Sequence, residues 1–373
     1  MLRFKKGEKF KIMQIADIQE VPNISIDTVN LLKKAIHSEK PDLVVLTGDQ
    51  IKGYGISYKG KGAELEAAIK VTIDKFMEEI VALGIPFAVT FGNHDRQVGV
   101  SNKDQFEDIY AKISGFTAEN VSYIDGSVNF NVEIKASEGD KTALNLYLLD
   151  SGTDQKNGYE PVYEPQLEWY KTLREKLKGE NGDEYVPSMV FQHIPIFEYF
   201  DVLKQVKRTA KGAMRAYRTH KNQWYVLGDT CREGDILLEP PSIPDVNTGE
   251  FETLKEKGDV FAMYVGHDHK NSFVGTLEGI DLGFTQSAGF NEYGNGVHRG
   301  VRIFEFDEAD VRKYETRTVE FKTLCGNKLD KPVKDFIFRH FPASKDAAII
   351  LARNVLGGLC VVGAAAWAIT NLI

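Results

Sequence analysis

The sequence predicts an α/β fold built on a mainly parallel sheet. Short apolar runs typical of buried strands alternate with longer segments whose apolar residues recur at helical spacing, a pattern typical of parallel sheets. Of the 373 residues, 42% are hydrophobic and 27% are charged, which excludes a collagenous, disordered or disulfide-scaffold protein. Several predicted strands also end in aspartate or histidine, so the same pattern points to a functional site.

The first part of the chain alternates regularly between strand and helix patterns. In chain order, we expect a strand at residues 10–15, a helix at 25–38, a strand at 43–46, a helix at 64–83 and a strand at 86–90. The first strand runs into Asp17, the second ends in Gly48-Asp49, and the third leads to the run Gly92-Asn93-His94-Asp95.

The second part continues this style and then changes. In chain order, we expect paired strands at 128–134 and 144–149, a helix at 166–178, and strands at 188–192 and 260–265. The last two strands end at His193 and at Gly266-His267-Asp268-His269. Short strands and glycine turns at 273–319 predict an antiparallel layer, and 54–62 and 234–258 are predicted loops.

Net charge and cysteine usage narrow the function classes. The 46 Lys and Arg residues against 54 Asp and Glu give a formal charge of −8, so no nucleic-acid partner is expected. Cys231, Cys325 and Cys360 are too few and too scattered for a disulfide framework or a zinc knuckle, which indicates thiols in a reducing compartment.

The uncharged stretch at 355–373 predicts a membrane anchor. As a helix these residues would span about 28 Å, close to a hydrocarbon core of about 30 Å, although a C-terminal core helix is the alternative. Positive charges outnumber negative ones at 331–353, which favours the cytoplasmic side for the main domain. We therefore expect a catalytic domain at 1–330, a basic juxtamembrane linker at 331–353 and a single-pass C-terminal transmembrane anchor at 354–373.

Polar groups able to bind metal or move protons follow five of the predicted strands. Ligands of an open α/β sheet bind beyond the carboxyl ends of its strands, so residues distant in sequence converge there. These groups are Asp17, Asp49, Asn93 with His94, His193, and His267 with His269. One such residue alone is usually a turn or a satisfied polar group, but five together indicate a metal centre.

The order of these motifs resembles the calcineurin-like metallophosphoesterase superfamily, from Asp17 to about residue 320. That family's signatures are Asp-x-His, Gly-Asp, Gly-Asn-His-Asp/Glu, a lone His and Gly-His-x-His, and all but the first match completely here. The runs HIPIFEY and GHDHKNSF look most like the purple-acid-phosphatase-like branch. The resemblance implies a four-layer α-β-β-α sandwich, with the hydrophobic C-terminal helix added to it.

The resemblance also implies two metal ions bridged by Asp49. The first ion would take Asp17, Asp49, His269 and Gln19, and the second would take Asp49, Asn93, His193 and His267. Carboxylate, amide and imidazole ligands suit divalent or trivalent Mn, Fe, Zn or Mg, and the absence of thiolates argues against a structural zinc.

The expected chemistry is phosphoester hydrolysis by a metal-bridging hydroxide at this dinuclear centre. His94 would protonate the leaving oxygen and Asp95 would orient the His94 ring. Monoester hydrolysis is the first choice and diester hydrolysis the alternative, with a phosphorylated small molecule, protein or lipid as substrate.

Gln19 departs from the family pattern, which has histidine there. Its amide oxygen could bind the first metal weakly, or the amide could hydrogen-bond a metal-bound water. The hypothesis that follows is an enzyme that needs added Mn or Mg at the first site.

Weaker signals surround these motifs. Seven Lys and Arg residues and no acidic residue lie between Asp201 and Asp229, which suggests a solvated face, a funnel for an anionic substrate, or contact with lipid headgroups. The candidate substrate-binding residues are Arg96, Asn271, Arg208 and Arg215. Each of them could equally be an ordinary surface or turn residue.

Two further functions stay open. A membrane-surface pyrophosphatase or phosphodiesterase would act on a phospholipid or lipid-linked substrate, placing the enzyme on the cytoplasmic face of a membrane. A non-catalytic scaffold with a phosphoesterase fold is the third reading, and Gln19 is its support.

Overall fold

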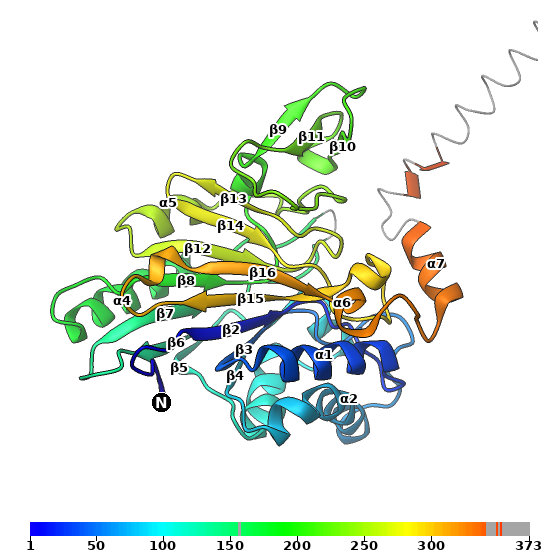
Figure 1. Ribbon diagram of the computed structural model, residues 1–373. Coiled ribbons are helices and arrows are strands. Elements are labelled where there is room, and N and C mark those ends of the chain that lie inside the picture. Colours follow the sequence, from blue (N-terminus) through cyan, green and yellow to red (C-terminus); the bar gives the residue numbers. More distant parts are fainter. Residues whose placement is uncertain (156–157, 341–347, 350, 353–373) are drawn as a thin grey trace, which may run out of the picture. The chain divides into compact units, whose positions relative to one another are not determined.

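The computed structural model describes residues 1–155, 158–340, 348–349 and 351–352 (Figure 1). The chain divides into two compact units, Met1–Asp330 and Lys331–Ile373. In the second unit the described part contains helix α7 (Pro332–His340). No helix in the described ranges is both long and apolar enough to cross a membrane, and the predicted anchor at 354–373 lies outside them, as does Cys360.

The described strands of the first unit form three sheets. The largest has eight strands in the order β1 (Leu2–Arg3), β6 (Ser127–Lys135), β7 (Thr142–Leu148), β8 (Ser188–Phe191), β12 (Val260–Val265), β14 (Ile280–Phe284) and β13 (Val274–Leu277), with β5 (Glu119–Ile124) paired to β6. The second has five, in the order β16 (Glu315–Glu320), β15 (Gly300–Phe306), β2 (Phe10–Ile15), β3 (Leu43–Thr47) and β4 (Phe87–Thr90). The third is small and consists of β10 (Met214–Arg215), β11 (Trp224–Leu227) and β9 (Leu203–Val206).

Each of the two large sheets contains both parallel and antiparallel strand pairs. The strands that lead to the predicted site residues pair in parallel. Strands β2, β3 and β4 pair in parallel, as do β7, β8, β12 and β14. The hairpins β6–β7, β13–β14 and β15–β16 pair antiparallel. The prediction of a mainly parallel sheet is therefore correct for the strands that are joined through helices. Parallel neighbours need a long crossover connection, and a helix provides one.

Six α-helices lie in the described part of the first unit. They are α1 (Ile26–Glu39), α2 (Ala63–Ala82), α3 (Asn102–Asp104), α4 (Glu164–Glu180), α5 (Glu250–Lys255) and α6 (Phe321–Cys325). Helices α1, α2 and α4 occupy the predicted positions to within a few residues. Helix α5 lies inside the predicted loop at 234–258, so that expectation was wrong for six residues.

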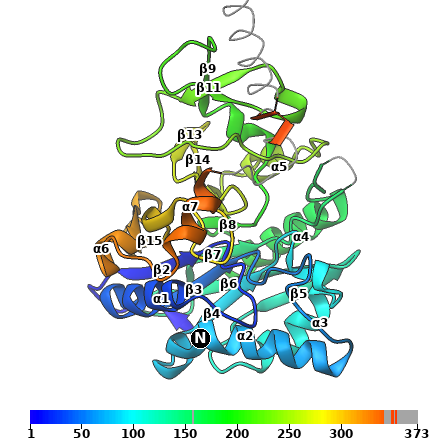
Figure 2. The ribbon, with the colours of Figure 1, turned by 90° about the vertical axis from the view of Figure 1, so that its right-hand side faces the viewer.

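Alternating side chains bury the eight-stranded sheet on both faces. In β7, Leu146 and Leu148 belong to one apolar core, which also contains residues of β2, β3, α1 and α2. Tyr147 of the same strand belongs to a second core, which also contains residues of α4 and α5. Because side chains of a strand point alternately to its two faces, the strands lie between the two sets of helices (Figures 1 and 2).

Candidate metal centre

The predicted metal ligands lie together at the carboxyl ends of strands from both large sheets. Asp17, Asp49 and Asn93 follow β2, β3 and β4 of the five-stranded sheet, while His193 follows β8 and His267 and His269 follow β12 of the eight-stranded sheet. All six residues are buried. The site therefore forms where the strand ends of two sheets meet.

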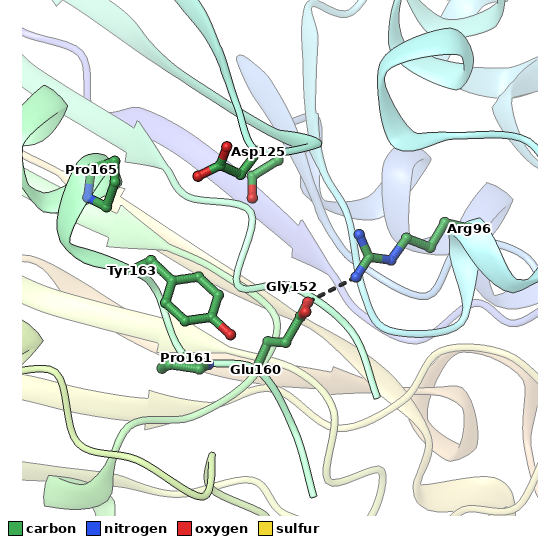
Figure 3. Close-up of a pocket in the computed structure, with 8 residues that line it drawn as sticks. Arg96, Asp125, Gly152, Glu160, Pro161, Tyr163 and Pro165 are labelled. Atoms are coloured by element: carbon green, nitrogen blue, oxygen red, sulfur yellow. Dashed lines mark hydrogen bonds and ion pairs between the residues drawn. The ribbon is translucent and has the colours of Figure 1, made fainter. Parts of the chain in front are cut away.

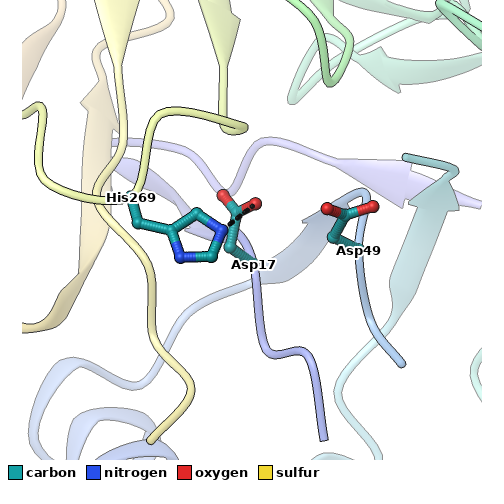
Figure 4. Close-up of side chains that lie close together, drawn as sticks. All are labelled: Asp17, Asp49 and His269. Carbon is teal, nitrogen blue, oxygen red and sulfur yellow. Dashed lines mark ion pairs between the residues drawn. The ribbon is translucent and has the colours of Figure 1, made fainter. Parts of the chain in front are cut away.

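Asp17, Asp49 and His269 form the first cluster (Figure 4). One potential ligand atom from each lies within 4.8 Å of the other two. The Nδ1 atom of His269 lies 2.8 Å from the Tyr293 carbonyl oxygen, so Nδ1 carries the proton and donates it. The Nε2 atom lies 3.4 Å from Asp17 Oδ1, and it has a lone pair available for a metal ion when the ring is neutral. Within the described residues this buried Oδ1 atom accepts no hydrogen bond.

His193 is the centre of the second cluster. Its Nδ1 atom lies 2.9 Å from the Thr47 carbonyl oxygen, which fixes the proton on Nδ1 and leaves a lone pair on Nε2 when the ring is neutral. That Nε2 atom lies 3.1 Å from Asn93 Oδ1, 3.3 Å from Asp49 Oδ2 and 3.2 Å from His267 Nδ1. Four potential ligand atoms, including His193 Nε2 itself, thus lie close together. A single proton on His193 Nε2 could not form hydrogen bonds with all of the other three.

Electrostatics reflect the same crowding. Burial opposes the charging of His193, but the Asp49 and Asp17 carboxylates outweigh it and raise the pKa of His193 to about 10. Burial would raise the pKa of Asp49, yet the His193 and His94 rings hold that pKa below its usual range. The site therefore needs positive charge, and without another cation a histidine has to carry it.

The donor set fits a pair of cations. Asp49 belongs to both clusters, and the ligand atoms are carboxylate oxygens, imidazole nitrogens and one amide oxygen, which suit borderline and hard metal ions. The orphaned oxygen of Asp17 and the crowded lone pairs around His193 are what a cation would satisfy.

Gln19 contacts the shared carboxylate. Its Nε2 group donates a hydrogen bond of 2.8 Å to Asp49 Oδ2. Its Oε1 atom is buried, and within the described residues it has no hydrogen-bond partner. The hydrogen bond to Asp49 was not among the roles expected for Gln19, whereas the unused oxygen leaves both expected roles, metal ligation and a hydrogen bond to a metal-bound water, as predictions.

His94 is the site histidine that reaches solvent, with a side chain 25% exposed, whereas His193 is fully buried. The His94 Nε2 atom lies 3.9 Å from Asp49 Oδ2. Its Nδ1 atom lies 2.8 Å from Gln97 Oε1, and the Tyr54 ring packs against it at 4.4 Å between centroids. These two contacts fix the ring beside the cluster.

Asp95 has other partners than the expected His94 ring. Its carboxylate accepts hydrogen bonds from the backbone N–H groups of Asp49, Gln50, Ile51 and Gly92. Burial and the neighbouring Asp49 charge raise the pKa of Asp95 to about 8, against the lowering effect of these donors. Asp95 thus ties the turn after β3 to the turn after β4, while Gln97 holds the His94 ring.

The predicted substrate contacts are dispersed. The Arg96 guanidinium pairs with Glu160 at 2.8 Å, on the wall of a pocket of about 290 Å³ (Figure 3). Both amide atoms of Asn271 are used by the backbone of Leu238 and Glu239, so Asn271 holds that loop in place and its expected role at the substrate is not supported. Arg208 is exposed, and Arg215 lies over the Trp224 ring.

Three tyrosines that the sequence did not single out contact site histidines. Tyr54 packs on His94, Tyr159 meets His267 edge-on at 4.4 Å, and Tyr293 stacks on His269 at 4.1 Å. They come from loops without a spacing pattern, so no signal in the sequence could have found them.

Comparison with known proteins identifies the family and the fold. A family model described as calcineurin-like phosphoesterase matches residues 10–271. "Probable inactive purple acid phosphatase 29" of Arabidopsis thaliana is 28% identical, over 84% of this chain and 80% of its own length. "Phosphatase DCR2" of Saccharomyces cerevisiae is also 28% identical, over 71% of this chain and 45% of its own. A dimetal phosphatase from Danio rerio shares the fold with a TM-score of 0.51 and 14% identity, covering 84% of this chain and 99% of its own.

Proposed function

The chain belongs to the calcineurin-like phosphoesterase family, whose members are hydrolases of phosphoric esters with a dinuclear metal centre, and we propose that it hydrolyses phosphate monoesters. One observation carries the proposal: two sets of ligand atoms converge on a single carboxylate, Asp49, at the meeting point of two sheets. Diester hydrolysis is the alternative reaction of the same site.

Each residue of the site has a defined task. Asp17, Asp49 and His269, with the Gln19 oxygen, would hold the first cation, and Asp49, Asn93, His193 and His267 would hold the second. Bound cations supply an activated water and neutralise the negative charge that develops on the phosphoryl oxygens. Manganese, iron, zinc and magnesium are all compatible with these ligands. His94, which reaches solvent and is held by Gln97 and Tyr54, gives its proton to the leaving oxygen.

Metal reconstitution tests the proposal. The purified chain is stripped of metal, supplied with Mn, Fe, Zn or Mg, and assayed with p-nitrophenyl phosphate and bis(p-nitrophenyl) phosphate. We expect metal-restored turnover that is lost in Asp49→Asn and kept in Asp74→Asn, a change of an exposed aspartate on α2. The ratio of the two rates chooses between monoester and diester. Metal binding without turnover on either ester would contradict the proposal.

A non-catalytic scaffold is the second candidate. It is favoured by Gln19 in place of the family's histidine and by relatives whose names describe them as probable inactive. The reconstitution experiment separates the two, because a scaffold would bind little metal and would show no turnover.

We also propose a place of action. The uncharged sequence at 355–373 and the basic residues before it favour a C-terminal anchor on the cytoplasmic face of a membrane. A phospholipid or lipid-linked diphosphate would then be within reach as a substrate.

A further inference from the structure

The loop between β7 and α4 lies against the turn that follows β4. The Glu160 N–H group donates a hydrogen bond of 2.9 Å to the Thr153 carbonyl oxygen, and the Thr153 N–H group donates one of 2.9 Å to the Glu160 carboxylate. The Thr153 hydroxyl in turn donates a hydrogen bond of 3.1 Å to the carbonyl oxygen of Asn93. The loop is therefore fixed beside this metal-site turn, and the next residue of the loop is Asp154.

The Asp154 carboxylate accepts hydrogen bonds from two side-chain amides. The Asn93 Nδ2 group donates to Asp154 Oδ1 at 3.0 Å, and the Gln97 Nε2 group donates to Asp154 Oδ2 at 2.6 Å. An ionised carboxylate accepts hydrogen bonds and donates none. Each amide must therefore turn its NH₂ group toward Asp154 and its carbonyl oxygen away from it.

For Asn93 this orientation places the oxygen at the second cluster. The Asn93 Oδ1 atom lies 3.1 Å from His193 Nε2, among the potential ligand atoms around that histidine. The reversed amide would present an NH₂ group there, which repels a cation instead of binding it. Asp154 thus keeps Asn93 in the only orientation that can serve as a metal ligand.

For Gln97 the same orientation places the oxygen at the proton donor. The Gln97 Oε1 atom lies 2.8 Å from His94 Nδ1, so it accepts a hydrogen bond from an Nδ1–H group. The other ring nitrogen, His94 Nε2, lies on the side of the cluster, 3.9 Å from Asp49 Oδ2. When Nε2 gives its proton to the leaving oxygen, the neutral ring that remains carries its proton on Nδ1, and Gln97 stabilises that form.

We propose that Asp154 is a positioning residue that fixes the direction of both amides, so that the Asn93 oxygen faces the second cation and the Gln97 oxygen faces His94. The inference rests on the proposed function, because it takes Asn93 as a metal ligand and His94 as the proton donor. It adds that one carboxylate of a distant loop prepares both groups for their tasks.

Asp154→Asn tests the inference with almost no change of shape. Asparagine replaces one carboxylate oxygen by an NH₂ group, which cannot accept a hydrogen bond from another NH₂ group. Either Asn93 or Gln97 then has to reverse its amide or lose its hydrogen bond to position 154. Reversal of Asn93 weakens metal binding, and reversal of Gln97 moves the proton of the neutral His94 ring from Nδ1 to Nε2.

Two measurements on the full chain detect these changes without any turnover. Calorimetric titration of the metal-stripped chain gives the affinity for Mn²⁺, and long-range proton–nitrogen NMR spectra of the metal-free chain show which nitrogen of the neutral His94 ring is protonated. The His94 signals are those that disappear in His94→Gln. We expect Nδ1–H in the unaltered chain. In Asp154→Asn we expect Mn²⁺ affinity at least about tenfold lower, a His94 proton on Nε2, or both.

A double variant restores the hydrogen-bond directions. With Asp154→Asn and Gln97→Glu together, the introduced glutamate accepts from His94 Nδ1–H and from the introduced asparagine, whose oxygen accepts from Asn93. Both readouts should return to those of the unaltered chain. Asp245→Asn is the charge control, because a Cβ atom on Gly158 would lie 2.2 Å from Asp245 Oδ1, so this exposed carboxylate lies against the same loop. It should change neither readout.

Four results would overturn the inference: a His94 proton on Nε2 in the unaltered chain, no change of either readout in Asp154→Asn, an equal change in Asp245→Asn, or no recovery in the double variant. If the unaltered chain bound no Mn²⁺, the proposed function would fail. The His94 tautomer needs no metal and would then decide the inference alone, since a shift in Asp154→Asn supports it and an unchanged tautomer overturns it.

Discussion

Asp17, Gln19, Asp49 and His267 all have left-handed backbone, with φ between 39° and 71°. Non-glycine residues rarely adopt this conformation, which costs about 1–3 kcal/mol for each residue held there. Asp17, Asp49 and His267 each lie two residues after the end of a strand, where the chain turns, and Gln19 lies two residues after Asp17 in the first of these turns. The left-handed residues, which are themselves predicted ligands, therefore lie in three turns, those after β2, β3 and β12.

Gln19→His should strengthen metal binding. Histidine tolerates left-handed backbone, and an imidazole nitrogen is a better ligand than the Gln19 amide oxygen. We expect the affinity of the stripped chain for Mn²⁺ to rise about tenfold, a typical effect of altering one group at a metal site, as measured by calorimetric titration. Gln205→His, which adds a histidine on the exposed face of β9, should leave the affinity unchanged. Equal affinity in Gln19→His and the unaltered chain would contradict this expectation.

At the scale of single residues, the sequence predicted that the site residues lie close together, but not which groups each of them contacts. Asp17, Asp49 and Asn93 each follow a recognisable strand of the five-stranded sheet, and strand ends of one sheet meet at one edge, so their convergence could be predicted from the sequence. Their service as ligands stays a prediction. The hydrogen-bond partners of Asp95 and Asn271 are backbone groups of loops that are distant in sequence. The residues that flank Asp95 and Asn271 in the sequence do not indicate these partners.

At the scale of elements, Gly92 decides how closely strands β3 and β4 can end together. A Cβ atom on Gly92 would lie 2.2 Å from Asp49 Oδ1 and 2.6 Å from the Asp49 backbone nitrogen. Gly92→Ala should therefore displace Asp49, with a loss of at least about 2 kcal/mol in unfolding free energy and a loss of metal affinity. Urea unfolding and metal titration measure the two effects.

Gly179→Ala is the matched control, because Gly179 lies in helix α4 with nothing within 4 Å of the added Cβ. That change should raise the unfolding free energy by about 0.5–1 kcal/mol, the ordinary preference for alanine in a helix. If Gly92→Ala behaved like this control, the close approach would be refuted.

Glu250, the first residue of α5, should make the unfolding free energy depend on pH. Burial, reinforced by the charge of Glu198, raises the pKa of Glu250 from 4.5 to about 8. Between these values the unfolded chain loses the proton while the folded chain keeps it. The unfolding free energy therefore falls as pH rises through this window, by up to about 1.4 kcal/mol per pH unit.

Glu250→Gln removes this titration, so the variant should gain stability relative to the unaltered chain between pH 5 and pH 8. Urea unfolding at the two pH values measures the change. Glu252→Gln, on the exposed side of the same helix, should leave the pH dependence as it was. A parallel pH dependence in all three chains would exclude Glu250 as the cause.

The elements that could be predicted are those with strong periodicity. The apolar runs of β2, β3 and β12 and the spaced apolar residues of α1 and α2 indicate their structures directly. The strands β9 and β11 are short and partly exposed, and helix α5 has only six residues. None of these three elements has a hydrophobic periodicity that distinguishes it from the loops around it.

At the scale of the whole molecule, the metal centre belongs to neither large sheet alone. Asp17, Asp49 and Asn93 come from one sheet and His193 and His267 from the other, so the ligands are complete only when the two sheets pack. Sequence patterns place residues within one sheet, whereas the packing of two sheets depends on side chains distant in sequence. The layered arrangement was therefore expected from a family resemblance and not from periodicity.

The C-terminal anchor is a prediction about the whole chain. The nineteen residues 355–373 carry no charge, while the metal-centre residues all lie in the compact unit Met1–Asp330. Full-length protein should therefore sediment with membranes, and a chain of residues 1–345 should stay in the supernatant with the same metal-dependent turnover. Val362→Lys, which keeps the length but puts a charge in mid-stretch, should weaken sedimentation because it costs about 3 kcal/mol at the bilayer centre. Sedimentation of residues 1–345, or none of the full-length chain, would reject the anchor while leaving the phosphoesterase proposal intact.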